Sequence, residues 1–112
     1  YVLISPDFEA RYHELAHDEQ KNAIGLITTA FTLNRLFPIV ADKHLIKTCK
    51  GKGNENTYEL RDIGKGIRIY FQSYNNFLLL GGIHTKAEGV GDEQSADINR
   101  ATSACTRLKA SL

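Results

Sequence analysis

The sequence contains no methionine, no tryptophan, only two prolines and only two cysteines. Cys49 and Cys105 are far apart and form no CxxC pattern, which argues against a zinc ribbon, a redox motif or a disulfide framework. No apolar run approaches the ~18 residues of a membrane span, and no secretory signal opens the chain. We therefore expect a cytoplasmic protein. Because the chain begins at Tyr1 without a methionine, we also expect at least an initiator residue before it.

The length of 112 residues, of which 42% are hydrophobic, fits a single domain over residues 1–112. A net charge of +1 does not by itself indicate a nucleic-acid-binding protein. The charge is unevenly distributed, since residues 41–70 carry 7 basic and 4 acidic residues while residues 1–40 carry 3 basic and 5 acidic ones. The excess of positive charge lies in and just before the segment that carries the strongest strand pattern.

That segment is residues 58–82. Apolar and polar side chains alternate over residues 67–72, which is typical of a strand with one buried face. Residues 58–61 alternate in the same way, and the glycine-rich residues 62–66 between the two runs predict a turn. A second turn follows at residues 73–76, before the fully apolar run Phe77–Leu80, which predicts a strand covered on both faces. We predict three antiparallel strands in succession.

The flanking segments predict helices. Ser5 and Pro6 are suited to the start of a first helix, and a second helix is expected from Asp18 to about Leu36, before Pro38. Residues 1–4 predict an edge strand. Asp92 or Ser95 can cap the last helix, which carries an apolar stripe that can pack on the sheet or on a partner: Ile98, Ala101, Cys105, Leu108 and Leu112. The expected fold is α+β in the order β-α-α-β-β-β-α, an antiparallel meander with an N-terminal helical hairpin and a C-terminal helix.

Several strings in residues 58–112 resemble the RelE/ParE toxin superfamily, in particular its RelE- and HigB-like members. They are YELR, a glycine-rich turn, GIRIYF, a polar turn, LLLGG with a lysine shortly after, and DIxxA in the last helix. The resemblance covers about residues 58–112 in sequence, and the remainder only in the order of elements. It implies a RelE-like fold and a toxin of a bacterial type II toxin-antitoxin system. Such toxins are ribosome-dependent mRNA endoribonucleases that inhibit translation, generally without a metal or other cofactor.

The same resemblance implies partners and site residues. The expected partners are a cognate antitoxin, the ribosome and mRNA, with DNA reached only through the antitoxin complex. Arg68 stands at the arginine of the family's G-[YI]-R motif, Arg61 at a basic position of the first meander strand, and Lys86 at a basic position after the third. Relatives use a tyrosine or histidine near the last helix, where His84 and Tyr70 are the nearby substitutes. The expected catalytic residues are thus Arg68, Arg61, Lys86 and His84, and the expected RNA-binding residues are Lys50, Lys52, Lys65 and Tyr70.

Other functions stay open. A ParE-like branch of the superfamily inhibits DNA gyrase without nuclease chemistry, and a degenerate toxin would retain only antitoxin binding and co-repression. The two arginines could also form part of a solvated strand face, with Glu59 and Arg68 as an ordinary cross-strand ion pair.

Residues 13–17, with the sequence HELAH, match the zinc-binding HExxH motif. The neighbouring residues are charged, and neither a downstream GxxH nor a glutamate about twenty residues later supplies a third ligand. We therefore expect no metal site there, and interpret His13 and His17 as surface residues with Leu15 facing the core. A GKGN string at Gly51–Asn54 lacks the spacing of a phosphate-binding loop and predicts an ordinary lysine-bearing loop.

Overall fold

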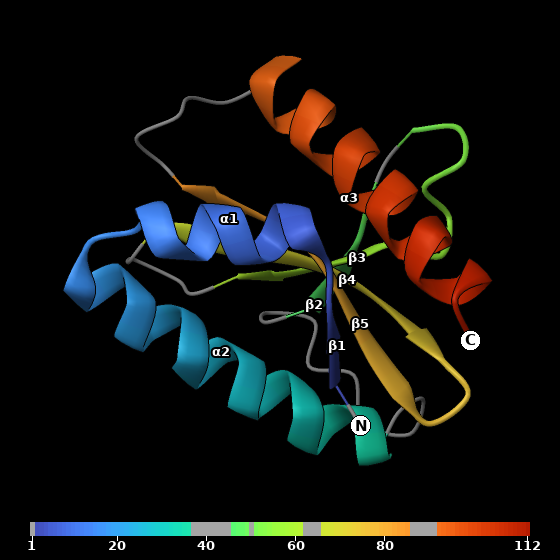
Figure 1. Ribbon diagram of the computed structural model, residues 1–112, viewed down its shortest axis with the longest axis horizontal. Coiled ribbons are helices and arrows are strands. Elements are labelled where there is room, and N and C mark those ends of the chain that lie inside the picture. The colour runs from blue at the N-terminus through green and yellow to red at the C-terminus, as the bar shows by residue number, and fades with distance from the viewer. Residues whose placement is uncertain (1, 37–45, 50, 62–65, 86–91) are drawn as a thin grey trace.

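The structure is a computed structural model that describes residues 2–36, 46–49, 51–61, 66–85 and 92–112. Within these residues three helices and five strands form an α+β fold, which confirms the predicted class (Figure 1). In chain order the elements are β1 (Val2–Ile4), α1 (Pro6–Glu14), α2 (His17–Leu36), β2 (Ile46–Thr48), β3 (Tyr58–Arg61), β4 (Ile67–Tyr74), β5 (Phe77–Thr85) and α3 (Asp92–Ala110).

The predicted meander forms the centre of the sheet. The strand order is β1-β5-β4-β3-β2, and β3, β4 and β5 pair antiparallel in succession. A two-residue turn joins β4 to β5, and its Asn75 has a φ of 54°, a conformation that asparagine tolerates better than most residues. β1 pairs parallel with β5, so the expected edge strand is present.

The order of elements differs from the expected one by a further strand. β2, over Ile46–Thr48, pairs antiparallel with β3, in a stretch between the second helix and the meander for which the sequence predicted no strand. Three residues among lysines give too short an alternation to be recognised as a strand. Its backbone groups nevertheless extend the ladder beyond β3, so that β3 is an inner strand rather than an edge.

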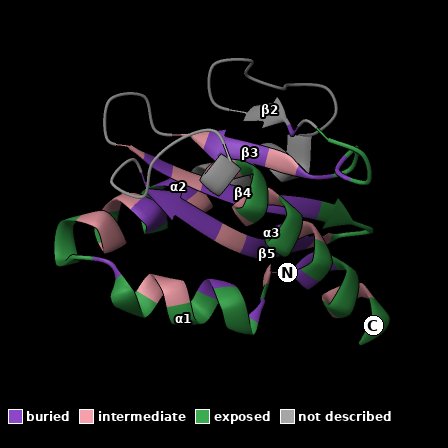
Figure 2. Cartoon of the chain, turned by 90° about the horizontal axis from the view of Figure 1, so that it is seen from above, coloured by how far each residue is buried: buried purple, intermediate pink, exposed green. Residues whose placement is uncertain are grey.

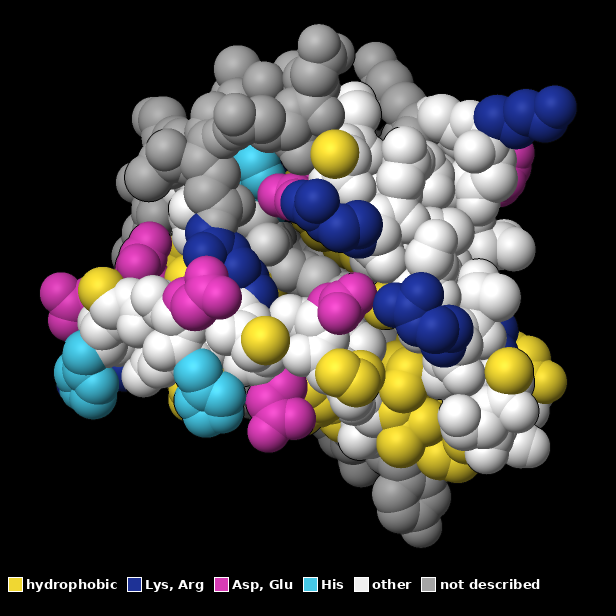
Figure 3. All heavy atoms as spheres, turned by 45° about the horizontal axis from the view of Figure 1, so that its top comes forward, with side chains coloured by type: hydrophobic (Ala, Val, Ile, Leu, Met, Phe, Trp, Pro, Cys, Tyr) yellow, Lys and Arg dark blue, Asp and Glu magenta, His cyan; other side chains and the backbone are white. Residues whose placement is uncertain are grey.

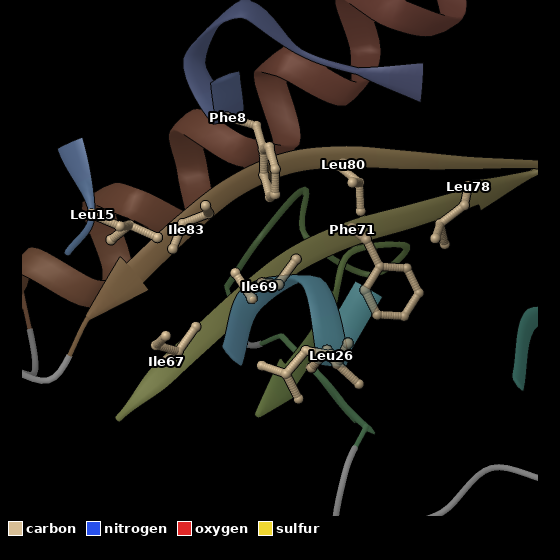
Figure 4. Close-up of a cluster of buried hydrophobic side chains, with 11 residues drawn as sticks. Phe8, Leu15, Leu26, Ile67, Ile69, Phe71, Leu78, Leu80 and Ile83 are labelled. Carbon is tan, nitrogen blue, oxygen red and sulfur yellow. The ribbon is translucent and has the colours of Figure 1, made fainter. Parts of the chain in front are cut away.

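One face of the sheet packs against α1 and α2 and holds the main hydrophobic core. The Ser5 hydroxyl accepts the amide N–H of Phe8 at 3.0 Å and so caps α1, as predicted. Figure 4 shows side chains of both helices packed against those of β4 and β5. The core residues are Phe8, Leu15, Ala23, Leu26, Leu60, Ile67, Ile69, Phe71, Leu78, Leu80 and Ile83. The apolar members of the β4 alternation therefore face inward as expected.

The opposite face is covered by α3, so the polar residues of β4 do not form the expected solvated face. Tyr70 and Gln72 are both buried, and purple marks the buried positions on the strands beneath α3 in Figure 2. The Gln72 amide donates to the Thr57 hydroxyl at 2.8 Å, and Thr57 in turn lies 2.7 Å from the Thr102 hydroxyl of α3. The interface is thus a mixed layer of small apolar and hydrogen-bonded polar side chains.

The apolar stripe of α3 packs on the sheet. Ala101 and Cys105 are fully buried, and Ile98 packs against the small cluster formed by Cys49, Tyr70 and Ala101. Of the two alternatives that the sequence left open, the sheet rather than a partner covers the centre of this stripe.

Two glycines of β5 permit the close approach of α3. A Cβ atom at Gly81 would lie 2.5 Å from the carbonyl oxygen of Ala101 and 2.9 Å from Cys105 Sγ. A Cβ atom at Gly82 would lie 3.2 Å from the Ala101 methyl group. Position 81 therefore excludes any side chain unless the helix moves, because real Cβ atoms do not approach a backbone oxygen so closely.

We expect Gly81→Ala to lower the free energy of unfolding by about 1–3 kcal/mol, the usual cost of overpacking. The measurement is urea denaturation. Gly25→Ala is the matched control, because a Cβ atom there meets nothing within 4 Å and the exposed interior of α2 favours alanine by up to about 1 kcal/mol. An unchanged midpoint for Gly81→Ala would contradict the close packing of α3.

Candidate functional site

The structure brings Arg61 and Arg68 together on neighbouring strands. They are direct cross-strand partners of β3 and β4, and each side chain is 28% exposed. Like charges in directly opposed positions are normally destabilising. The carboxylate of Glu59 compensates for this, since its Oε2 accepts from Arg61 Nη2 at 2.8 Å and its Oε1 lies 3.4 Å from Arg68 Nε. We call these three residues the arginine cluster.

Glu59 is the buried member of the arginine cluster. Its side chain is 7% exposed, and it accepts a third contact from the Gln94 amide of α3, at 3.0 Å from Oε1. A carboxylate at this depth requires such partners, because loss of hydration is costly for a charge. Arg61 Nε is also buried, and it has no hydrogen-bond partner among the residues that the structure describes. The Glu59–Arg68 ion pair that the alternative interpretation proposed therefore exists, within a larger and more buried cluster.

His84 lies on β5 directly opposite Arg68. It is 1% exposed, and its Nδ1 is 2.6 Å from Asp97 Oδ2 of α3. The other carboxylate oxygen of Asp97 pairs with Arg100, one turn further along the helix. His84 is therefore close to the arginines, as predicted, but its ring does not reach the surface.

Tyr70 lies on the same strand face as Arg68 but is fully buried beneath α3. Burial raises the pKa of its phenol well above the ordinary value, and the nearby Gln94 amide acts in the opposite direction. A ring in this position has no exposed face on which a base could stack. Tyr70 is therefore an interface residue of α3 in this structure, and the RNA contact expected of it is not available here.

Of the expected lysines only Lys52 falls within the described residues. It is exposed in the turn between Gly51 and Gly53. That turn is anchored to α3, because the buried Asn54 donates to Asn99 at 2.9 Å and accepts from the Thr102 hydroxyl at 2.6 Å. Three further predicted residues lie outside the described part of the chain: Lys50, Lys65 and Lys86.

The HExxH string spans a break between two helices. α1 ends at Glu14, Leu15 is its extended C-cap, and α2 begins at His17. His13 and His17 are therefore not one turn apart on a single helix, as the zinc motif requires. Glu14 instead pairs with Arg11 at 2.8 Å. Among the residues described, no group of three or more histidine, cysteine, aspartate or glutamate side chains could hold a metal ion.

A groove of about 610 Å³ lies between α1, β5 and α3. Figure 3 shows charged side chains of both signs gathered over α1 and α3 on this side of the molecule. The groove is lined by charged residues that largely pair with one another, and by the small residues beneath them: Arg11 with Glu14, Arg100 with Asp97, and Gly81 and Gly82. It meets the candidate site at Asp97, which contacts His84 on its other side.

Three participants were not predicted as site residues. Glu59 entered only as the partner of Arg68 in an ordinary ion pair, Asp97 only as the first residue of the DIxxA string, and Gln94 in no motif. Gln94 and Asp97 are three residues apart and so lie on the same side of α3. Their spacing relative to the apolar residue Ile98 would have indicated that they border the buried stripe.

No protein-family model and no curated protein match the sequence. Among solved structures, the protein is similar to the solution structure of the conserved hypothetical protein HP0894 from Helicobacter pylori. The TM-score is 0.46 and the identity 14%, over 77% of this chain and 93% of that one. A similarity at this level carries no argument about function. Separately, none of the helices in the described part of the chain is long and apolar enough to cross a membrane.

We expect Glu59→Ala to lower the free energy of unfolding by about 1–3 kcal/mol, because it leaves two adjacent, partly buried arginines and the Gln94 amide without their common acceptor. Glu14→Ala is the control, since it removes an ion pair of the same 2.8 Å length that is more exposed. Its effect should stay within about 0.5 kcal/mol. Equal losses in urea denaturation would mean that Glu59 is no more than a surface ion-pair partner.

Stability should also fall at alkaline pH. Burial raises the pKa of the Cys105 thiol from 9.0 to about 11, so the unfolded chain loses this proton first. Its contribution is complete below about pH 9 and is lost as the pH rises to about 11, at about 1.4 kcal/mol per pH unit. Burial raises the pKa values of Cys49 and Tyr70 as well, with the same sign. In urea denaturation at several pH values in this range, the free energy of unfolding of Cys105→Ala should fall less steeply with pH than that of the wild-type protein. An equally steep fall would contradict the contribution of the Cys105 thiol.

Proposed function

We propose that the protein is a RelE-like toxin of a bacterial type II toxin-antitoxin system, and that it cleaves mRNA on the ribosome. The observation that carries the proposal is the pair Arg61 and Arg68, which are adjacent, partly exposed and held by a buried carboxylate. These are the positions at which the sequence resembles the basic residues of the superfamily. The antiparallel meander on which they lie and the last helix across it support the same assignment.

The chemistry requires cations at one phosphate. In metal-free RNA cleavage the 2′-hydroxyl loses its proton to a base and attacks the adjacent phosphorus, and negative charge develops on the phosphorane oxygens. The P–O5′ bond then breaks, the 5′ oxygen takes up a proton from an acid, and a 2′,3′-cyclic phosphate remains. A guanidinium group offers a planar fork that holds two of the phosphorane oxygens, and two neighbouring arginines can hold them from both sides. Glu59 limits the motion of both groups, which favours stabilisation of a transition state over loose attraction of a polyanion.

The proposal assigns different tasks to the remaining candidates. His84 is covered, so in the present arrangement it supports the site rather than touching the substrate. Lys52 is exposed and suited to contacting the RNA backbone. Lys50, Lys65 and Lys86 are assigned to the same surface by the sequence alone.

The burial of His84 and Tyr70, on the face of the sheet that α3 covers, favours a second candidate function. Cleavage requires proton transfer, whereas binding does not, and His84 and Tyr70 are 1% and 0% exposed. The alternative is a protein without enzymatic activity: a ParE-like gyrase inhibitor, or a degenerate toxin that binds its antitoxin and acts with it as a co-repressor. Gyrase-dependent DNA damage or harmless overexpression would favour this alternative.

The proposed regulatory partner is a small cognate antitoxin. Because the sheet covers the centre of the α3 stripe, the antitoxin would dock mainly on the face that carries the arginine cluster, where its acidic side chains would meet Arg61 and Arg68. Co-expression with the neighbouring gene should relieve growth arrest and yield a stable complex. A protein that is equally innocuous with and without that gene would contradict the toxin assignment.

We expect Arg68→Ala to lower the rate of mRNA cleavage on ribosomes by about 10²- to 10³-fold, the usual loss when one charge-stabilising donor is removed. Arg68→Lys should recover only part of the rate, because lysine keeps the charge without the fork. Primer extension on ribosome-bound mRNA measures both.

Arg107→Ala is the control, since Arg107 is also ion-paired, to Asp7 at 3.3 Å, but lies on the exposed side of α3. It should cleave at the wild-type rate. A thermal melt of each variant separates catalysis from folding. Full activity of Arg68→Ala would remove this residue from the site, and no cleavage by the wild-type protein would contradict the nuclease assignment itself.

A further inference from the structure

Helix α3 carries two polar side chains that reach down to the sheet on either side of Arg68. Gln94 Nε2 donates to Glu59 Oε1 on β3 at 3.0 Å, and Asp97 Oδ2 lies 2.6 Å from His84 Nδ1 on β5. Because the two helix residues are three positions apart, they project from the same side of α3. One helical turn therefore contacts both strands that flank β4.

Arg68 lies between these two contacts. His84 is its cross-strand partner on β5, and Glu59 Oε1 lies 3.4 Å from its Nε. That oxygen is the one to which Gln94 donates. The side chain of Arg68 is thus bordered on one side by an acceptor that α3 holds through Gln94, and on the other by an imidazole that α3 holds through Asp97.

We infer that Gln94 and Asp97 are positioning residues for Arg68. The inference rests on the proposed function insofar as it concerns cleavage, but the positions that it assigns can be measured without any activity. Gln94 fixes the direction of the Glu59 carboxylate, and Asp97 fixes the orientation and tautomer of His84. Neither residue touches the substrate.

Each contact has a defined physical effect. A glutamate side chain has several rotamers, and the Gln94 amide favours the one in which Oε1 faces Arg68. A carboxylate beside Nδ1 keeps the proton of a neutral imidazole on that nitrogen and so orients the ring. The other oxygen of Asp97 is occupied by Arg100, which limits rotation of the carboxylate itself.

The first experiment measures the tautomer of the His84 ring and the position of the Arg68 side chain by nitrogen-15 NMR. The His84 ring should show the Nδ1-protonated tautomer in the wild-type protein and a mixture in Asp97→Asn. Arg107→Gln is the control, because it breaks only the exposed pair with Asp7 and leaves His84, Asp97 and Arg100 in place, so it should keep the wild-type pattern. The Arg68 Nε–H signal should shift in Gln94→Ala. Unchanged His84 and Arg68 signals in the variants would overturn the inference.

The second experiment measures cleavage of ribosome-bound mRNA. Gln94→Ala and Asp97→Asn should each lower the rate by about 10- to 100-fold, as substitutions of residues that orient a functional group commonly do. Gln94→Glu should be worse than Gln94→Ala, because it places a second carboxylate against Glu59. Asp7→Asn is the matched control, since Asp7 also pairs with an arginine of α3 but contacts no residue of the arginine cluster.

The two failures are distinguishable. If the wild-type protein cleaves nothing, the proposed function fails while the NMR measurement still decides whether α3 positions Arg68. If the wild-type protein cleaves and both variants cleave at its rate, the positioning role is wrong although the nuclease assignment stands.

Discussion

The arrangement of the candidate site depends on how closely α3 lies against β5. At Gly81 there is no room for a side chain, because the backbone of Ala101 occupies that space. This approach lowers the whole inner side of the helix onto the sheet. Asp97 is one turn before Ala101 and Gln94 nearly two turns before it, so both can reach buried groups of the strands. Gly81, a residue without a side chain, thus sets the distance from which the side chains of Gln94 and Asp97 reach the sheet.

Beneath the helix, the charges of the arginine cluster do not cancel. Two guanidinium groups share one carboxylate, so the cluster retains a net positive charge. Because the carboxylate is buried and the guanidinium groups are partly exposed, the uncompensated charge faces outward. An anion that approached this surface would meet donors whose orientation is already fixed. This feature distinguishes the pair from lysines on a loop, whose charge attracts a polyanion but does not fix the position of a phosphate.

The sequence predicted most of the sheet because alternation along a strand reports which side chains are apolar. Ile67, Ile69 and Phe71 face the core as expected, and the fully apolar run in β5 is covered on both sides. It did not predict that the polar side of β4 is also buried, because a strand pattern cannot indicate that a later helix will cover Tyr70 and Gln72. β2 escaped prediction for a related reason, since its pairing with β3 involves the backbone and leaves little pattern in three residues.

The site was predicted only in part. Arg61 and Arg68 were named because of the resemblance, and the structure shows that they are directly opposed on neighbouring strands. The depth of Glu59 could not be predicted, because it results from a contact with a residue 35 positions later. Asp97 appeared only as the aspartate of the DIxxA string, and its contact with His84 could not be predicted because it depends on the imidazole that the sheet presents to it.

The two candidate functions make different chemical demands on this face: binding an anionic group needs cations, and cleaving RNA needs proton transfer as well. Holding a phosphate requires only cations, and Arg61 and Arg68 are available at the surface as the protein is folded. Cleaving the RNA also requires a proton acceptor and a proton donor, and the imidazole and phenol of this face are buried under α3. Among the described residues, the exposed groups of this face account for holding a phosphate, and the proposed cleavage needs a further group for proton transfer. In the proposed nuclease that group would come from the ribosome, from a shift of α3 that exposes His84, or from the lysines at positions 50, 65 and 86.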